Sequence, residues 1–171
     1  VEVGPKNRKV FFVSLPLEVE VTIKTKKDEI PIDKITPIAL KKAWYGQPHS
    51  GDLSYFFLTP VYYSLNEAEK RLGEALLPVR VRNLDEKVHS IEKLMVDSYQ
   101  LSLYEKDGVL LAEVVEVVFL HDEAEVDYTD EAPFPECVEI LKGEESAKKK
   151  GLSKLTRRRL KKFTHELFGG G

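Results

Sequence analysis

The sequence predicts a mainly β protein, either a β-sandwich or an open barrel, with one short inserted helix and a basic C-terminal helix. Many short segments alternate apolar and polar residues, turn residues recur about every ten positions, and one internal stretch has helical spacing. The residues after 140 differ in composition from those before. We therefore expect a β-rich body at residues 1–140, followed by a basic linker and an amphipathic helix at residues 141–171.

The first 63 residues have the patterns of strands and turns. Val10–Val13 is an apolar run that ends before Pro16, and Leu17–Lys24 alternates with the period of a half-buried strand, so we expect an antiparallel pair here. Pro31 and Pro37 divide the next stretch into pieces too short for a helix. Further strands are expected at 38–45 and, with an interruption at proline 60, at 53–63.

A helix is predicted over Ser64–Leu77. Ser64 or Asn66 can cap its N-terminus, and acidic residues occupy its first turn. The apolar residues then follow near helical spacing, at positions 65, 68, 72, 75 and 76. Gly73 lies inside this stretch and weakens the helix by about 1 kcal/mol relative to alanine.

The second half of the body again has strand patterns. Val79–Asn83 and Ser98–Tyr104 alternate, and Glu105–Gly108 has the composition of a hairpin turn, with glycine where a positive φ is needed. Val109–Leu120 is apolar on both faces. Such a strand is expected near the middle of a sheet or between two layers.

Composition excludes several classes. The chain has 171 residues, 42% of them hydrophobic, which suits one folded domain, and its single cysteine, Cys137, permits neither an internal disulfide nor a multi-cysteine zinc site. Charged or turn residues break every apolar run before a membrane-spanning length. Abundant Lys and Glu with few thermolabile side chains is typical of thermophile proteins, so we expect a cytoplasmic thermophile protein.

The overall net charge of −3 conceals a strong division. Residues 141–171 contain ten Lys or Arg and three Glu, a net charge of +7, whereas residues 1–140 contain 16 basic and 26 acidic residues. Residues 121–139 contain eight Asp or Glu and no Lys or Arg. Such asymmetry indicates an arm with a partner of its own.

The arm is predicted to form a helix from Ser153 to about Phe168. Leucines and a phenylalanine at 152, 155, 160, 163 and 167 share one face, and basic side chains fill much of the rest. A helix with these two faces fits an anionic partner, and RNA ranks first because adjacent arginines offer bidentate phosphate contacts. The residues expected to bind nucleic acid are Lys154, Arg157, Arg158, Arg159, Lys161 and Lys162.

One loop combines polar and aromatic residues that could line a pocket. The candidate pocket residues are Trp44, Tyr45, Gln47, His49 and Asp52. No catalytic residue is assigned, because the chain lacks the nucleophile, phosphate-loop and dinucleotide signatures, and no cofactor is expected.

No metal site is expected either. The acidic residues at 121–139 do not follow the spacing of a calcium-binding loop, and the four histidines form no recognisable constellation in the sequence.

The order of segments, from an N-terminal strand pair through PVRVRN (78–83) to VLLAEVVEVVFL (109–120), resembles an uncharacterised archaeal family of β-rich proteins of unknown function. The resemblance covers about the middle half of the chain and rests on hydrophobic patterns. It implies an archaeal source and carries over no activity and no site residue.

Two functional hypotheses follow. The first is a non-enzymatic binding or adaptor module whose C-terminal arm contacts an anionic partner, RNA first. The alternative is a small-ligand-binding protein or enzyme with a pocket at the 44–52 loop. A third reading, in which the arm packs on its own acidic body, would leave no partner implied by the charge division. The oligomeric state is not predicted.

Overall fold

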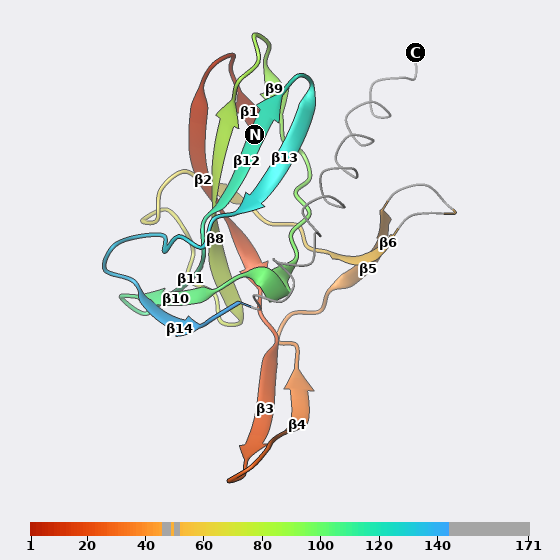
Figure 1. Ribbon diagram of the computed structural model, residues 1–171, viewed down its shortest axis with the longest axis vertical. Helices are drawn as coiled ribbons and strands as arrows, with labels where there is room; N and C mark the ends of the chain where they lie inside the picture. The colour runs from red at the N-terminus through yellow and green to blue at the C-terminus, as the bar shows by residue number, and fades with distance from the viewer. Residues whose placement is uncertain (46–48, 50–51, 144–171) are drawn as a thin grey trace.

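The computed structural model describes residues 1–45, 49 and 52–143 (Figure 1). This part of the chain is mainly β, and its one helical element is a single 3-10 turn, η1 (Ser98–Gln100). No closed barrel forms among the described strands. The strands are β1 (Glu2–Val3), β2 (Arg8–Pro16), β3 (Val19–Lys24), β4 (Glu29–Ile35), β5 (Lys41–Tyr45), β6 (Asp52–Phe56), β7 (Val61–Tyr62), β8 (Glu74–Asn83), β9 (His89–Ser90), β10 (Leu103–Lys106), β11 (Val109–Ala112), β12 (Val115–Leu120), β13 (Glu123–Tyr128) and β14 (Val138–Leu141).

The largest sheet has eight strands and is organised around β8. Its main path runs β13-β12-β8-β11-β10-β14, and β2 joins β8 and β7 off this path. β2 pairs with β8 in antiparallel register along its full length, from Arg8 opposite Arg82 to Pro16 opposite Glu74. β11 and β12 pair with β8 in parallel, with Leu111 opposite Leu76 and Val115 opposite Val79. The central strand is therefore held by segments from both ends of the body.

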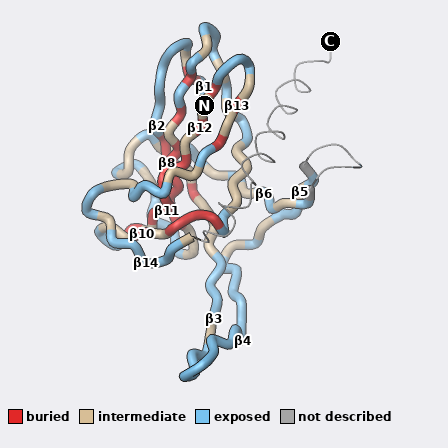
Figure 2. The backbone as a smooth tube through the Cα atoms, viewed as in Figure 1, coloured by how far each residue is buried: buried red, intermediate tan, exposed pale blue. Residues whose placement is uncertain are grey.

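The core lies on one face of this sheet. Valines and aromatic residues of β2, β8, β12 and β13 alternate onto that face, and Val3 of β1 and Leu101 pack against them. Figure 2 shows buried stretches of the backbone along β8 and β11. A second cluster around Leu76, Tyr104 and Leu111 is buried elsewhere in the body. The predicted place of the 109–120 segment in the middle of a sheet is confirmed, because β11 and β12 flank β8 in the sheet and Leu111 and Ala112 are fully buried. The expected burial of both faces does not extend to the end of β12, where Leu120 is 43% exposed. The segment is interrupted at Glu113, a buried residue whose side chain accepts a hydrogen bond from the Ser102 N–H at 3.1 Å.

The hairpin predicted at Glu105–Gly108 is confirmed. β10 and β11 pair in antiparallel register with Lys106 opposite Val109, which leaves Asp107 and Gly108 as a two-residue turn. Both turn residues have positive φ, 51° and 75°. A two-residue turn in which both residues have positive φ matches the right-handed twist of the paired strands. Glycine adopts positive φ readily, so Gly108 indicated this turn in the sequence.

The helix predicted over Ser64–Leu77 is wrong. Turns occupy this region up to Gly73, and β8 begins at Glu74. Leu72, which a helix would bury, is 98% exposed, and Gly73 has a φ of 81° that ends any helical path. The apolar residues from 75 to 77 belong instead to a strand that is buried on both faces, and a short buried strand mimics helical spacing.

Two hairpins extend away from the large sheet, β3–β4 and β5–β6 (Figure 1). The expected pairing of the first two long strands is therefore wrong, because β3 pairs with β4 and β2 pairs with β8. The chain leaves the sheet after β2 and returns at β7, where Val61 lies opposite Val13. The Ser14 N–H also donates to Thr59 Oγ1 at 2.8 Å, so the two ends of this excursion lie side by side.

The predicted C-terminal helix and its six basic candidate residues (Lys154, Arg157, Arg158, Arg159, Lys161 and Lys162) lie outside the described residues. The division of the chain at residue 140 likewise remains a prediction.

Candidate functional site

The predicted pocket residues fall on the β5–β6 hairpin. Trp44 and Tyr45 end β5, Asp52 begins β6 opposite Tyr45, and His49 is exposed in the connection. Gln47 lies outside the described residues. Two hollows on the described part of the body, of about 280 Å³ and about 250 Å³, are lined by other residues.

One face of this hairpin is aromatic and basic. Antiparallel partners share a face of the ribbon, and the register places Lys42 opposite Tyr55 and Trp44 opposite Leu53. Trp44 is 54% exposed and Tyr55 62% exposed. The face thus offers two accessible ring systems next to a lysine.

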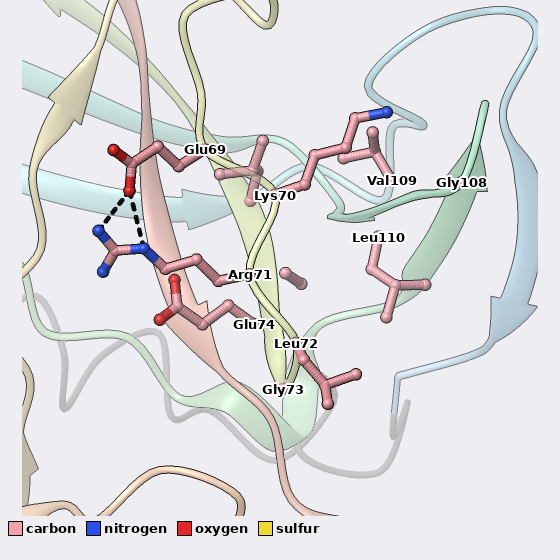
Figure 3. Close-up of a pocket in the computed structure, with 11 residues that line it drawn as sticks. Glu69, Lys70, Arg71, Leu72, Gly73, Glu74, Gly108, Val109 and Leu110 are labelled. Carbon is pink, nitrogen blue, oxygen red and sulfur yellow. Dashed lines mark hydrogen bonds and ion pairs between the residues drawn. The ribbon is translucent and has the colours of Figure 1, made fainter.

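The larger hollow lies between the 69–76 segment and the β10–β11 turn (Figure 3). Arg71 forms an ion pair with Glu69 on its rim, and Lys70 Nζ donates to the Asp107 carbonyl at 3.3 Å. The Glu69 carboxylate, through its hydrogen bond and charge, raises the pKa of Arg71. These are exposed surface contacts, and the hollow holds no hydrogen-bonded pair of a general acid and a general base among the contacts described.

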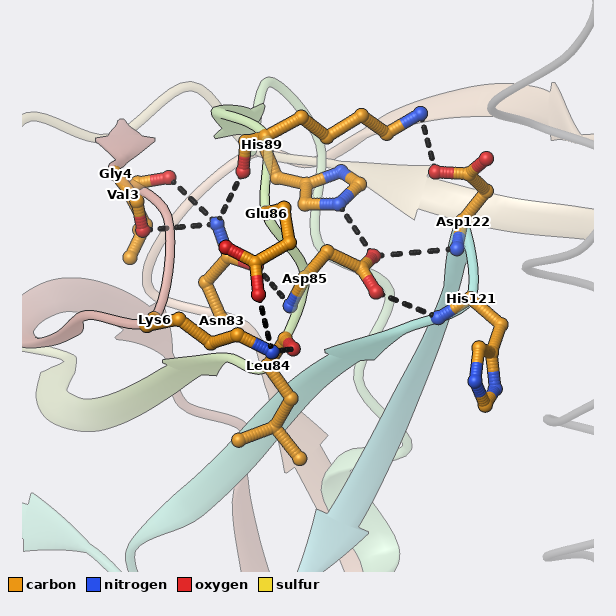
Figure 4. A network of polar contacts seen from close by, with 11 residues as sticks. Val3, Gly4, Lys6, Asn83, Leu84, Asp85, Glu86, His89, His121 and Asp122 are labelled. Carbon is orange, nitrogen blue, oxygen red and sulfur yellow. Dashed lines mark hydrogen bonds and ion pairs between the residues drawn. The ribbon is translucent and has the colours of Figure 1, made fainter.

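The most connected polar cluster lies where β8 ends (Figure 4). Asn83 is 1% exposed, and its Nδ2 donates to the carbonyls of Val3, Gly4 and Lys87 at 3.0, 2.9 and 2.7 Å. Its Oδ1 accepts from the Asp85 N–H at 2.9 Å. This one amide therefore joins the N-terminal strand to the turn that follows β8.

Asp85 continues the cluster to the β12–β13 hairpin. Its carboxylate accepts the N–H groups of His121 at 2.8 Å and Asp122 at 3.2 Å. Both residues have positive φ, 53° and 64°, and form the two-residue turn between Leu120 and Glu123 without any glycine. Two such successive N–H groups make a small anion-binding nest, and the Asp85 carboxylate occupies it.

His89 completes the cluster from the other side. Its Nε2 lies 2.7 Å from Asp85 Oδ2, and its ring stacks on Phe119 with the ring centroids 4.5 Å apart. Burial raises the pKa of Asp85, but the hydrogen bonds from the His121 N–H, the His89 ring and the Asp122 N–H outweigh it, so the pKa of Asp85 lies below its ordinary value. The carboxylate is thus held ionised beneath the turn.

Asp85, His89 and Asp122 bring three metal-ligating atoms within 4.8 Å of one another. These side-chain types suit a divalent transition metal. However, the Asp85 oxygens already accept three hydrogen bonds, Asp122 forms an ion pair with Lys87, and the His121 ring points away from the group (Figure 4). The cluster is therefore a hydrogen-bonded clamp that holds the turn between β12 and β13.

Sequence reasoning missed this cluster. It treated His89 and His121 as unconnected residues, because their connection runs through Asp85 and a parallel strand pairing. The one local signal was the spacing of Asp85 and His89, which lie four residues apart in the sequence.

The smaller hollow lies on the outer face of β12 and β13. It is lined by Val118, Leu120, His121, Glu123 and Glu125. In the hairpin register Val118 faces Glu125 and Leu120 faces Glu123, so each carboxylate stands beside an aliphatic side chain. We call these five residues the acidic groove.

The fold and its surfaces define a β-rich protein with two projecting hairpins, an internal polar clamp and an acidic groove. A family of proteins of unknown function, DUF432, matches residues 1–164, and the chain belongs to it. No curated protein and no solved structure matches the chain. None of the helical segments in the described ranges has the length and apolar character needed to cross a bilayer.

Proposed function

We propose that the protein is a non-enzymatic binding module whose basic C-terminal arm contacts an anionic partner, and that this partner is RNA. Adjacent arginines in the arm suit phosphate groups, which they can contact in bidentate fashion. The body, residues 1–140, carries a net negative charge and therefore repels a polyanion such as RNA. RNA is accordingly bound by the arm and by any local basic surface of the body.

The observation that carries the proposal is the exposed face of the β5–β6 hairpin. Trp44 and Tyr55 lie on one face of a two-stranded ribbon, and more than half of the surface of each residue is exposed. Bases of single-stranded RNA stack on such rings, at about 1–3 kcal/mol per base, and Lys42 is placed to meet a phosphate. A large aromatic residue left exposed on a small hairpin is typical of an interaction surface.

The polar cluster also supports a binding role over an enzymatic one. The hydrogen-bonded pair of Asp85 and His89 has the chemistry of an acid and a base, yet it lies beneath a turn and lines neither hollow. A general base needs access to the proton it removes.

We further propose that the fold is a β-sandwich and that the protein is cytoplasmic and comes from a thermophilic archaeon. The β1–β9 sheet lies over the core face of the large sheet, which supports the sandwich over the open barrel. The Lys- and Glu-rich composition supports a thermophilic source, the family resemblance an archaeal one, and both fit a cytoplasmic protein.

RNA binding by the full chain tests the proposal. Fluorescence anisotropy with an oligouridylate of about 20 nucleotides at about 50 mM salt should show binding, and log K should fall with log salt with a slope of about −3.5 if five phosphates are neutralised. Changing Arg157, Arg158 and Arg159 to alanine should weaken binding at least tenfold. The matched control removes three lysines from the β3–β4 hairpin, K24A/K26A/K27A, and should weaken binding much less.

The hairpin contribution has its own variant. Trp44→Ala with Tyr55→Ala should weaken binding about tenfold or more, because two stacking surfaces are lost. Ile23→Ala with Ile30→Ala, which also removes exposed apolar groups from a hairpin, should leave binding unchanged. Absence of RNA binding by the parent chain, or equal affinities for the arginine variant and its lysine control, would refute the proposed function.

A further inference from the structure

The β3–β4 hairpin, which projects from the body, has one aliphatic face. In its register Val19 lies opposite Ile35 and Ile23 opposite Ile30, and antiparallel partners share a face of the ribbon. Figure 2 shows nearly all of the hairpin backbone as exposed. We call five of its residues, each between 41% and 54% exposed, the aliphatic face: Val19, Val21, Ile23, Ile30 and Ile35.

The opposite face of the hairpin is polar, and its side chains contact one another. Lys34 Nζ donates to Glu18 Oε1 at 3.0 Å and forms an ion pair with Glu20 at 3.6 Å. Thr22 Oγ1 donates to Glu29 Oε1 at 3.0 Å. Water suits this side, but a two-stranded hairpin becomes stable only when its apolar side packs against another element. The aliphatic face is therefore a surface that needs a cover.

One carboxylate lies near the middle of the aliphatic face. Asp33 is opposite Val21, between the pair formed by Val19 and the pair formed by Ile23, and its Oδ1 accepts the Lys34 N–H at 2.8 Å. A purely apolar cover would remove water from this carboxylate without replacing it by a cation. A second copy of the hairpin would bring its own Asp33 into the same apolar interface, where two like charges would be buried together. The cover that fits is apolar with one cation.

The C-terminal segment of this chain has that pattern. At about 100° per residue, the five apolar side chains of the predicted helix fall within an arc of about 140°. Arg159 falls inside the same arc, one turn after Leu155 and one turn before Phe163. The other basic candidates fall on the opposite side of the predicted helix: Lys154, Arg157, Arg158, Lys161 and Lys162. The segment thus has one cation within its apolar side, as the hairpin has one carboxylate.

The described chain ends near the base of the hairpin. The Gly143 N–H donates to Ser102 Oγ at 3.1 Å, and Gly143 packs directly against the carbonyl of Gln100 in η1. The pKa of Lys34 in β4 is raised, first by its hydrogen bond to Glu18, and Tyr99 of η1 is close enough to raise it further. Figure 1 likewise shows η1 above the point where the hairpin joins the body.

The lengths of the segments also match. The eight residues from 144 to 151 can span about 26–29 Å when extended, whereas the six residues of β3 cover about 20 Å, so the connection reaches every part of the aliphatic face. A helix over residues 152–168 would be about 25 Å long. It can therefore lie along the hairpin and cover this face from base to tip.

We propose that the aliphatic face of the β3–β4 hairpin is the docking site of residues 152–168 of the same chain, with Arg159 paired to Asp33. The docked arm keeps its five other basic candidates on the side away from the hairpin, where RNA binds them. This outward presentation rests on the proposed function, whereas the docking does not. Because docked and released arms offer RNA the same five cations, docking leaves the affinity for RNA unchanged.

The first test reverses the two charges in the full chain. Asp33→Lys and Arg159→Asp should each release the arm, and the two substitutions together should restore docking. Asp28→Lys is the matched control, because it makes the same charge change in the turn of the hairpin, outside the aliphatic face. Chymotrypsin cleavage after Phe163, measured by mass spectrometry and divided by the rate for the isolated 152–168 peptide of the same sequence, reports how often the arm is released.

Each single reversal should speed this cleavage at least about threefold at about 50 mM salt, while the double variant and the Asp28→Lys control should match the parent. A second pair of variants tests the apolar contact without a charge change. Val19→Thr with Val21→Thr keeps β-branched residues in β3 and should also speed cleavage, whereas Val88→Thr with Val138→Thr, at exposed positions elsewhere, should not. Equal cleavage of the parent, the single reversals and the Val19→Thr with Val21→Thr variant would overturn the docking.

A cross-link tests the pairing directly. Arg159→Lys keeps the charge and supplies an amine, which carbodiimide should couple to Asp33 within one chain. A cross-link found only between chains, with a yield that falls on dilution, would show that another copy supplies the arm and would refute docking within one chain. A dimer in analytical ultracentrifugation that Val19→Thr with Val21→Thr abolishes would show that a second hairpin covers the aliphatic face, and would refute the proposal as well.

RNA binding separates the docking from the proposed function. Val19→Thr with Val21→Thr should bind oligouridylate as tightly as the parent, and tighter binding would refute the outward presentation of the five cations. A parent that binds no RNA but shows the cleavage differences would refute the proposed function and retain the docking. A parent that binds RNA through the arm but shows equal cleavage throughout would retain the function and refute the docking.

Discussion

Asn83 is expected to be the polar residue on which the stability of the body depends most strongly. Its amide makes four hydrogen bonds, three to the carbonyls of Val3, Gly4 and Lys87 and one from the Asp85 N–H. Changing Asn83 to alanine removes all four at once. The Nδ2 group has two hydrogens, which its three carbonyl partners share, so three hydrogens take part in the four contacts. At a net value of about 1 kcal/mol for each of these hydrogens, the free energy of unfolding should fall by about 3 kcal/mol.

Asn83→Asp distinguishes hydrogen bonding from packing. Aspartate has nearly the same shape and keeps the acceptor for the Asp85 N–H, but it places a carboxylate oxygen where the amide met three carbonyl oxygens. Its loss of stability should be at least as large as that of the alanine variant. A packing role alone would leave Asn83→Asp close to the parent.

Guanidinium chloride unfolding at neutral pH measures these differences through the midpoint, provided that the m-value is unchanged. Asn7→Ala is the control, because its side chain accepts a hydrogen bond from the neighbouring Arg8 N–H at an exposed position. We expect that control to lose less than about 1 kcal/mol. A loss below about 1 kcal/mol in Asn83→Ala would refute the reasoning.

Three further predictions concern the body. The half-buried Tyr128 hydroxyl accepts the Asp97 N–H at 2.7 Å, and burial raises the pKa of Tyr128 to about 12 from 10.0. The free energy of unfolding should therefore fall between pH 10 and 12, by about 2–3 kcal/mol at the upper end, and Tyr128→Phe should lack this fall in alkaline urea titrations. Gly73→Ala should lower the thermal midpoint more than Gly108→Ala, because both have positive φ but only at Gly73 would a Cβ meet a proline side chain at 2.7 Å. The pKa of Asp85 is lowered in the folded state, so its ionised carboxylate stabilises the fold above about pH 4. This stabilisation is lost as the pH falls through the pKa of the folded state, so the parent should lose more stability than Asp85→Asn on acidification.

Local chemistry predicted a large part of the fold. The 105–108 turn was recognised because a two-residue hairpin requires positive φ, and the 109–120 segment was placed inside the sheet because both its faces are apolar. The helix over 64–77 failed because the buried strand beginning at Glu74 supplied apolar residues at spacings that also suit a helix. Pairing partners distant in sequence, such as β2 with β8, leave no local trace.

The candidate site was less predictable. Trp44 was singled out as a pocket residue, and its place on an exposed hairpin face depends on its pairing with Leu53, which the pattern of either strand alone does not specify. The clamp at Asp85 depends on a parallel pairing of β8 with β12 that brings the turn at His121 to the end of β8. Parallel pairings need long connections, so sequence periodicity does not reveal their register.

The adjacency of Val13 and Val61, with Ser14 bound to Thr59, makes residues 17–58 an insert rather than part of the framework. Every strand of the large sheet and both core clusters are supplied from outside it. A short linker between Pro16 and Thr59 could replace both hairpins without reordering a strand of the framework. The framework therefore tolerates changes in the length or sequence of both hairpins, much as the constant scaffold of an antibody domain tolerates changes in its loops.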